Sequence, residues 1–213
     1  MPLYLQQDIN EFTRLGVWQI AETVEYFQQK VSFRYPVAHT QKQLQHLAAG
    51  YLLPVLYPDF PYQSIETRTF QKPHIPGNPY FFSLSHCMGY AAAIVSSSHS
   101  VGIDIESISS RVQRIRHKFL SREENLWVSD FTPGEQDGIL TLLWSVKETV
   151  YKWLGQSGLI FNEHILIHPV NTETSQFAQV TLCHPQYAKQ LKVSFIKLGG
   201  LYCSFLVEPL PIN

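Results

Sequence analysis

The chain has 213 residues, of which 45% are hydrophobic and 15% are charged, and its formal net charge is −1. This composition excludes a disordered segment and is sufficient for a sizeable buried core, in one domain or two small ones. A net charge near zero gives no reason to expect nucleic acid or an anionic membrane as partner, so any anion binding must come from local clusters.

The cysteines and the N-terminus indicate the compartment. Cys87, Cys183 and Cys203 are scattered and form no C-x-x-C pair, which argues against a zinc site and a disulfide framework. The first residues lack the basic and apolar segments of a secretory signal, and the sequence contains no run of 18 apolar residues. We therefore expect a cytoplasmic protein without a membrane partner.

Hydrophobic periodicity predicts two helices in the first quarter of the chain. One runs from Trp18 to Lys30, because apolar residues recur there at steps of three and four. The second runs from Gln41 to about Leu53, and Pro54 and Pro58 close it. Both helices would present one apolar stripe to a core.

The next segment alternates between predicted strands and loops. Ser64 to Phe70 alternates weakly and indicates a strand, whereas Gln71 to Pro79 is rich in proline and indicates a loop. Three further apolar runs, separated by short polar turns, predict the strands Tyr80 to Leu84, Tyr90 to Ser96 and Val101 to Ile108.

The second half begins with predicted helices and ends with predicted strands. The helices are 111–131 and 133–154, and the latter has Thr132 as N-cap and Gly155 after its end. Gly199-Gly200 is a predicted hairpin turn. The four predicted strands are Ile160 to Ile167, Gln176 to Cys183, Leu191 to Ile196 and Leu201 to Val207. The sequence therefore predicts an α+β fold.

Two short segments carry the strongest chemical signal. In the strand-like V-G-I-D-I-E run, Asp104 and Glu106 project from one face, opposite the isoleucines between them. In the helical W-S-V-K-E-T-V-Y-K run, Trp144, Glu148 and Lys152 recur every four residues and share one stripe. Carboxylates on two rigid elements beside an ammonium could hold Mg²⁺ and a phosphate, because Mg²⁺ prefers a few hard oxygen ligands.

Each segment also has an ordinary explanation. An Asp-x-Glu pair on a strand is usually a solvated face. Glu148 and Lys152 alone would form a helical ion pair worth about 0.2–0.5 kcal/mol. Their joint presence is more specific than either segment alone.

Together the V-G-I-D stretch and, about forty residues later, the W-S-x-K-E-x-x-x-K helix resemble the signature of the 4′-phosphopantetheinyl transferases, in particular their longer, single-chain branch. The resemblance implies two similar α/β halves related by a pseudo-twofold axis, residues 1–107 and 108–213, with the active site in the cleft between them. It also implies a monomer that transfers the phosphopantetheine arm of coenzyme A to a serine of an apo acyl- or peptidyl-carrier protein and releases adenosine 3′,5′-bisphosphate.

The resemblance assigns roles at the expected catalytic centre. Asp104, Glu106 and Glu148 match the Mg²⁺ ligands, with Glu106 either bound directly or through a water molecule. Lys152 matches the lysine that contacts the pyrophosphate and can stabilise or protonate the departing oxygen. The base that accepts the serine proton is either Glu124 or Glu148. Ser121 and Glu124 also form an S-x-x-E capping box, which requires no catalytic role.

The other residues of the predicted helix 133–154 receive weaker assignments. Lys147 is offset from Glu148 by about 100° on the helix, so we expect it to face solvent or to contact the nucleotide only at its rim. Trp144 is expected to pack against the core or to form a wall of the pocket.

Further stretches resemble the coenzyme A-binding elements of the family. Ser85 and His86 end an F-S-L-S-H run like the family's phosphate-holding turn, and Lys72-Pro73 resembles G-(K/R)-P with glutamine in place of the glycine. Lys42 keeps one of two basic residues at a helix start that contacts the 3′-phosphate, and Gly50 stands where arginine is common. The missing charges leave open a catalytically weak paralogue that binds coenzyme A or a carrier without transfer.

A different magnesium-dependent phosphotransferase is the third possibility. The sequence argues against its usual forms because it contains no G-x-x-x-x-G-K-(S/T) phosphate loop.

Overall fold

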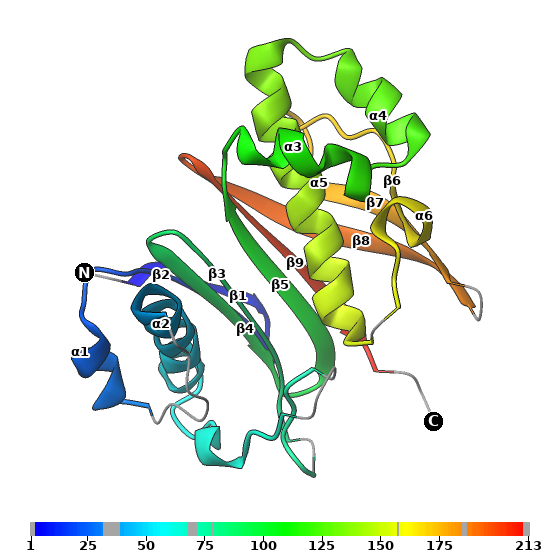
Figure 1. Cartoon of the computed structure of the whole chain (residues 1–213). Coiled ribbons are helices and arrows are strands. Elements are labelled where there is room, and N and C mark those ends of the chain that lie inside the picture. The colour runs from blue at the N-terminus through cyan, green and yellow to red at the C-terminus, as the bar shows by residue number, and fades with distance from the viewer. Residues whose placement is uncertain are drawn as a thin grey trace.

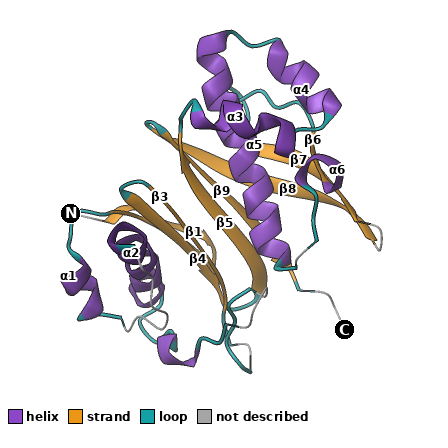
Figure 2. Cartoon of the chain, in the orientation of Figure 1, coloured by secondary structure: helices purple, strands orange, loops and turns teal. Residues whose placement is uncertain are grey.

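A computed structural model describes residues 3–31, 39–67, 72–77, 79–156, 158–184 and 187–210. These residues form two antiparallel sheets with helices packed against them (Figures 1 and 2), which confirms the predicted α+β class. None of the described helices is long and apolar enough to span a membrane.

The first sheet is built by the N-terminal part of the chain and has the strand order β1-β2-β4-β3. Its strands are β1 (Leu3–Asn10), β2 (Thr13–Gln19), β3 (Phe81–Cys87) and β4 (Tyr90–Ser96). The helical elements of this part are α1 (Val24–Gln28), α2 (Thr40–Leu56) and the 3₁₀ helix η1 (Tyr62–Ser64). In Figure 1, α2 lies along one face of this sheet.

Strand alternation gives this sheet two apolar faces. Trp18 packs in one core with Leu47 and Leu52 of α2, whereas Leu15 and Val17 of the same strand belong to a different core. Gly16 lets α2 approach closely, because a Cβ atom there would lie 3.1 Å from the Leu52 side chain. The first sheet is therefore covered on both sides.

The second sheet is built by the C-terminal part and has the strand order β5-β9-β8-β7-β6. Its strands are β5 (His99–Ser107), β6 (Ile165–Ile167), β7 (Phe177–His184), β8 (Tyr187–Leu198) and β9 (Leu201–Pro209). The helices are α3 (Arg111–Phe119), α4 (Arg122–Ser129), α5 (Pro133–Leu154) and α6 (Phe161–His164). The Gly199-Gly200 turn joins β8 to β9, as predicted.

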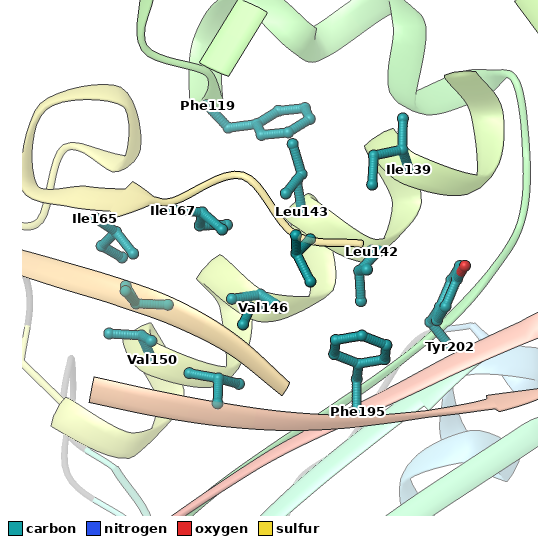
Figure 3. Close-up of a cluster of buried hydrophobic side chains, with 14 of the residues drawn as sticks. Phe119, Ile139, Leu142, Leu143, Val146, Val150, Ile165, Ile167, Phe195 and Tyr202 are labelled. Atoms are coloured by element: carbon teal, nitrogen blue, oxygen red, sulfur yellow. The ribbon is translucent and has the colours of Figure 1, made fainter. Parts of the chain in front are cut away.

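The long helix α5 organises the C-terminal core. Figure 3 shows Leu142, Val146 and Val150 of this helix facing side chains of the sheet, including Phe195. A capping box at Thr132 begins α5, and Gly155, in the left-handed conformation with φ 67°, ends it. These signals explain why the sequence predicted both ends of α5 correctly.

The two sheets meet along β3 and β5. The hydroxyl oxygen of Ser83 accepts a hydrogen bond from the Ile103 N–H at 3.2 Å, and that of Ser85 accepts one from the Ile105 N–H at 3.1 Å. Ile103 and Ile105 also share a buried core with Leu15 and other residues of the first sheet. Serine side chains and an apolar core thus fix β5 against the N-terminal part.

The relation between the two halves remains a prediction. Each sheet is covered by one long helix, α2 or α5 (Figure 1), as two similar halves require. β5 precedes the predicted boundary at residue 107, but its hydrogen bonds place it in the second sheet, beside β9.

Several predicted elements were wrong. The helix predicted from Trp18 to Lys30 is the end of β2 followed by the short helix α1, and β1 was not predicted. Residues 62–64 form η1 where a strand was predicted to begin at Ser64, and residues 68–70 of that prediction lie outside the described residues.

The predicted helix 111–131 is divided into α3 and α4, and the predicted strand 160–167 begins with α6. In the first case a capping box on Ser121 starts a new helix.

Candidate active site

A cavity of about 640 Å³ opens where α2, β3, β5 and α5 come together. This volume is in the usual range for small-molecule sites. Its wall combines residues of both halves: His46, Ser85, His86, Asp104, Glu106, Trp144, Glu148, Tyr151 and Lys152 are among them. The structure therefore gathers most of the predicted site residues around one cavity.

Asp104 lies at the buried end of this site, with 2% of its surface exposed. Its Oδ1 accepts hydrogen bonds from the Lys152 ammonium at 2.6 Å and from the Ser85 hydroxyl at 2.8 Å. Its Oδ2 is also buried but has no hydrogen-bond partner among the described residues. The expectation that Asp104 belongs to an exposed strand face is wrong, because α5 and β3 cover this face of β5.

Glu106 is held by the indole of Trp144, whose Nε1–H donates to its Oε1 at 3.1 Å. Burial, and then the nearby charge of Asp104, raise the pKa of Glu106 to about 7. Trp144 therefore lines the cavity, as one of the two predicted alternatives had it, and its indole N–H also orients a carboxylate.

Glu148 lies on α5 one turn before Lys152. Burial, followed by the charge of Asp104, raises the pKa of Glu148 to about 7. Two elements thus bring together three carboxylates and one ammonium, and the carboxylates repel one another.

The three carboxylates have the ligand chemistry that suits a hard divalent cation. Among the described residues, no group of three or more His, Cys, Asp or Glu side chains could hold a metal ion in its present arrangement. Two features nevertheless favour a cation. The unpartnered Oδ2 of Asp104 is an open oxygen ligand. Burial is the main cause of the raised pKa values of Glu106 and Glu148, and a cation would relieve the carboxylate repulsion that adds to it. All three side chains offer the hard oxygen atoms that Mg²⁺ takes.

The hydroxyl of Ser85 is fully engaged in positioning Asp104. It donates to Asp104, and its oxygen accepts from the Lys152 ammonium at 2.9 Å and from the Ile105 N–H. Since its one donor and two acceptor positions are used, the geometry favours a positioning role over the phosphate contact implied by the resemblance.

His86 lies beside a second histidine that the sequence analysis missed. The rings of His46 and His86 meet edge to face, with centroids 4.7 Å apart. Burial, and then the neighbouring His46 and the positive charges nearby, lower the pKa of His86 to about 4, so its imidazole is neutral at pH 7. His46 lies four residues after Lys42 on α2, and this helical spacing was the only sequence signal for it.

The two predicted lysines outside α5 are placed differently. Lys42 does not line the cavity formed by the described residues, but its charge contributes to lowering the pKa values of His46 and His86. Lys72 lines the cavity, yet its ammonium donates to the carbonyl oxygen of Val101 at 2.5 Å. Burial lowers the pKa of Lys72 to about 8.

Lys147 and Glu124 form a buried ion pair away from the carboxylates. Their atoms Nζ and Oε2 are 2.8 Å apart, and the side chains are 0% and 3% exposed. The expectation of a solvated Lys147 is wrong. Glu124 keeps the predicted capping box with Ser121 and does not line the cavity defined by the described residues, so the geometry favours a structural role over that of the base.

Comparison with known proteins agrees with this geometry. Residues 100–204, which contain β5 and α5, match the family model of the 4′-phosphopantetheinyl transferase superfamily. The chain is 28% identical over 174 residues to the 4′-phosphopantetheinyl transferase gsp of Aneurinibacillus migulanus, and the match covers 78% of this chain and 72% of that protein. By these two matches the chain is similar to the 4′-phosphopantetheinyl transferase superfamily, over residues 100–204 in the family model and over 174 residues in the relative.

Proposed function

We propose that this protein transfers the 4′-phosphopantetheine arm of coenzyme A to a serine hydroxyl of an apo acyl- or peptidyl-carrier protein, in a reaction that requires Mg²⁺. The observation that carries the proposal is the cavity in which Asp104, Glu106 and Glu148 converge beside the ammonium of Lys152. The similarity to the 4′-phosphopantetheinyl transferase superfamily supports the reaction type, and the chemistry of these side chains supports the cation.

The three carboxylates would hold the Mg²⁺ ion. Asp104 offers its unpartnered Oδ2, Trp144 fixes Glu106, and α5 carries Glu148. Mg²⁺ in this position would withdraw charge from the pyrophosphate of coenzyme A.

Lys152 is placed to act on the leaving group. The serine hydroxyl gives up its proton to Glu148, the candidate base that lines the cavity, and its oxygen forms a new bond to the β-phosphorus. The bond from that phosphorus to the bridging oxygen breaks, so that adenosine 3′,5′-bisphosphate leaves. The Lys152 side chain is 26% exposed, so its ammonium can reach an anion in the cavity as well as Asp104. Its charge stabilises the departing oxygen, and one of its protons can neutralise that oxygen.

Neutral imidazoles and one lysine supply recognition of coenzyme A. His86 offers an N–H donor at the wall of the cavity, His46 lies beside it, and Lys42 adds a positive charge nearby. Lysine binds phosphate as a point charge, in contrast to the bidentate arginine that is common where Gly50 stands.

Mass spectrometry of an apo carrier protein tests the proposal. The carrier is incubated with this protein, coenzyme A and Mg²⁺, and a parallel sample contains a chelator. We expect the mass of the carrier to increase by one phosphopantetheine only when Mg²⁺ is present. Metal-dependent binding of coenzyme A without a gain in mass, across a panel of apo carriers from the same cell, would support a binding paralogue instead.

A further inference from the structure

Lys147 of α5 and Glu124 of α4 form a buried ion pair that also hydrogen-bonds a third part of the chain. The ammonium of Lys147 donates to Glu124 at 2.8 Å, to the carbonyl oxygen of Phe161 at 3.0 Å and to that of Ile165 at 2.5 Å. All three N–H donors of this ammonium are therefore used. Two of its three partners are backbone atoms of one short segment, α6 and the start of β6.

The carboxylate of Glu124 binds the backbone of the same segment. Its Oε1 accepts from the Ile167 N–H at 2.7 Å, and its Oε2 accepts from the Ser121 N–H at 2.7 Å. The pair thus ties residues 161–167 to α4 and α5 through buried, charge-assisted hydrogen bonds. Such bonds are short and directional, so they fix the backbone of this segment in one place.

The segment in turn supports a wall of the active site. The ring of Phe161 packs on the indole of Trp144, with centroids 5.6 Å apart, and Phe119 contacts the same indole from another side at 5.3 Å. The indole N–H of Trp144 donates to Glu106. A continuous series of contacts therefore runs from the Lys147 ammonium through Phe161 and Trp144 to a carboxylate of the cavity.

We propose that Lys147 and Glu124 are positioning residues for Glu106: through Phe161 they hold Trp144 where its N–H orients this carboxylate toward the cation. This inference rests on the metal site in the proposed function. It assigns a role in the active site to two residues that do not line the cavity formed by the described residues. Groups that orient a metal ligand typically change metal affinity by about 10–100-fold when they are removed.

Calorimetric titration of the metal-free protein with Mn²⁺ tests the inference without an activity measurement. Mn²⁺ prefers the same oxygen ligands as Mg²⁺. The Lys147→Met/Glu124→Gln variant removes both charges together, so no buried carboxylate is left unpaired. Trp144→Phe removes only the indole N–H and keeps an aromatic ring between Phe119 and Phe161. We expect each variant to bind Mn²⁺ at least about tenfold more weakly than the wild type.

The combined variant decides between positioning and a merely structural role. If the ion pair acts through Trp144, the triple variant that combines Trp144→Phe with the double variant will bind Mn²⁺ no more weakly than whichever of these two variants binds it more weakly. If the two losses multiply, or if the double variant lowers Tm but binds Mn²⁺ like the wild type, the inference is wrong. Phe161→Leu tests the middle of the series if the double variant does not fold, and the same loss of affinity is expected.

Thr13→Val is the control for stability. It removes the buried hydrogen bond between Thr13 and Ser96 at 2.8 Å, in the first sheet, so it should lower Tm without changing Mn²⁺ affinity. All titrations are made below the lowest Tm. A wild type that binds no Mn²⁺ would overturn the metal site and this inference together. A wild type that binds Mn²⁺ as tightly as its variants would overturn the inference alone.

Discussion

Lys147 and Lys152 lie on the same helix, but the structure gives them different surroundings. Lys152 shares a stripe with Glu148 and contacts Asp104 at the cavity, whereas Lys147 points into the C-terminal core and binds Glu124. The spacing of the two residues predicted their different directions. It could not show that α4 and residues 161–167 cover the side on which Lys147 lies.

Kinetic and stability measurements on alanine variants separate these lysines. Lys152→Ala removes a charge aimed at the leaving group and should lower kcat by about 10²–10³. It also leaves the buried Asp104 carboxylate without its ammonium partner, so Tm should fall as well. Lys147→Ala leaves the buried Glu124 carboxylate unpaired and should lower the free energy of unfolding by about 3–5 kcal/mol. Denaturant unfolding measures the second effect. A kcat loss in folded Lys147→Ala at saturating Mg²⁺ that is as large as the loss in Lys152→Ala would contradict this assignment.

The raised pKa of Glu148 predicts how stability changes with pH. Its pKa in the folded protein is about 7, above the ordinary 4.5, so the folded state binds more protons than the unfolded state between these values. The contribution of this group is therefore favourable below pH 4.5 and is lost as the pH rises through 7. Glu148→Gln avoids this loss, so its stability relative to the wild type should be greater at pH 8 than at pH 5.

Urea unfolding of the metal-free protein at the two pH values measures this difference. Glu11→Gln, at an exposed position between β1 and β2, is the matched control and should change little at either pH. A Glu148→Gln effect that is the same at pH 5 and pH 8 would show that burial does not shift this carboxyl.

At the scale of elements, Gly102 determines how closely α5 crosses β5. A Cβ atom at this position would lie 2.4 Å from the backbone carbonyl oxygen of Thr149 and 2.9 Å from the backbone nitrogen of Trp153. These are backbone atoms, so a larger residue must move the helix away from the strand. Because β5 carries Asp104 and α5 carries Glu148, the two sides of the active site would separate.

Gly102→Ala should therefore lower both Tm and transfer activity, with the activity loss persisting at temperatures where the variant is fully folded. Gly138→Ala is the control on the same helix, because a Cβ there meets nothing within 4 Å. It should be neutral or stabilise the protein by up to about 1 kcal/mol. Full activity of folded Gly102→Ala would contradict the role of this crossing.

The exposed side of α3 is expected to meet the carrier. Its apolar side, including Phe119, packs into the core beside Trp144, while Arg114 and Lys118 are exposed. Carrier domains are typically acidic, so the basic side chains of α3, a helix that contacts the cavity-wall residue Trp144 through Phe119, should attract them. Arg114→Glu/Lys118→Glu should raise the KM for the carrier about tenfold, equivalent to 1.4 kcal/mol.

Steady-state kinetics with the carrier and with coenzyme A distinguishes this effect from general damage. The KM for coenzyme A should stay unchanged in the α3 variant. Lys192→Glu, on β8, changes the charge at a second exposed lysine and should leave both constants unchanged. An unchanged carrier KM in the α3 variant would exclude this side of α3 as a docking surface.

The wrongly predicted elements have two causes, an ambiguous apolar spacing and an overlooked helix cap. Trp18, Val24 and Phe27 do contribute to one core, as the helical spacing suggested, but a strand end and a short helix produce the same spacing. The helix 111–131 was predicted as continuous although the sequence contained the Ser121–Glu124 capping box that divides it. Local patterns identified apolar faces well, but strand pairing across the chain decided the type of element.

For the whole molecule, the sequence predicted which residues meet better than it predicted their surroundings. The resemblance to the family predicted that Ser85, His86, Asp104 and Glu148 belong to one site, and they line one cavity although they lie on three elements. It did not predict that Asp104 is buried or that His46 joins the wall. Both depend on how the first sheet and α2 pack against β5, which no local pattern records.

The central claim is that the cavity between the two sheets carries a Mg²⁺-dependent transfer that needs Asp104. Asp104→Asn keeps the size of the side chain and removes the charge that the cation and Lys152 require. Mass spectrometry of one apo carrier, treated in parallel with the wild type and this variant, tests the claim most directly. We predict that the wild type adds one phosphopantetheine and that the variant does so at least about 100-fold more slowly. No gain in mass with the wild type across the carrier panel, or equal rates for both proteins, would contradict the account.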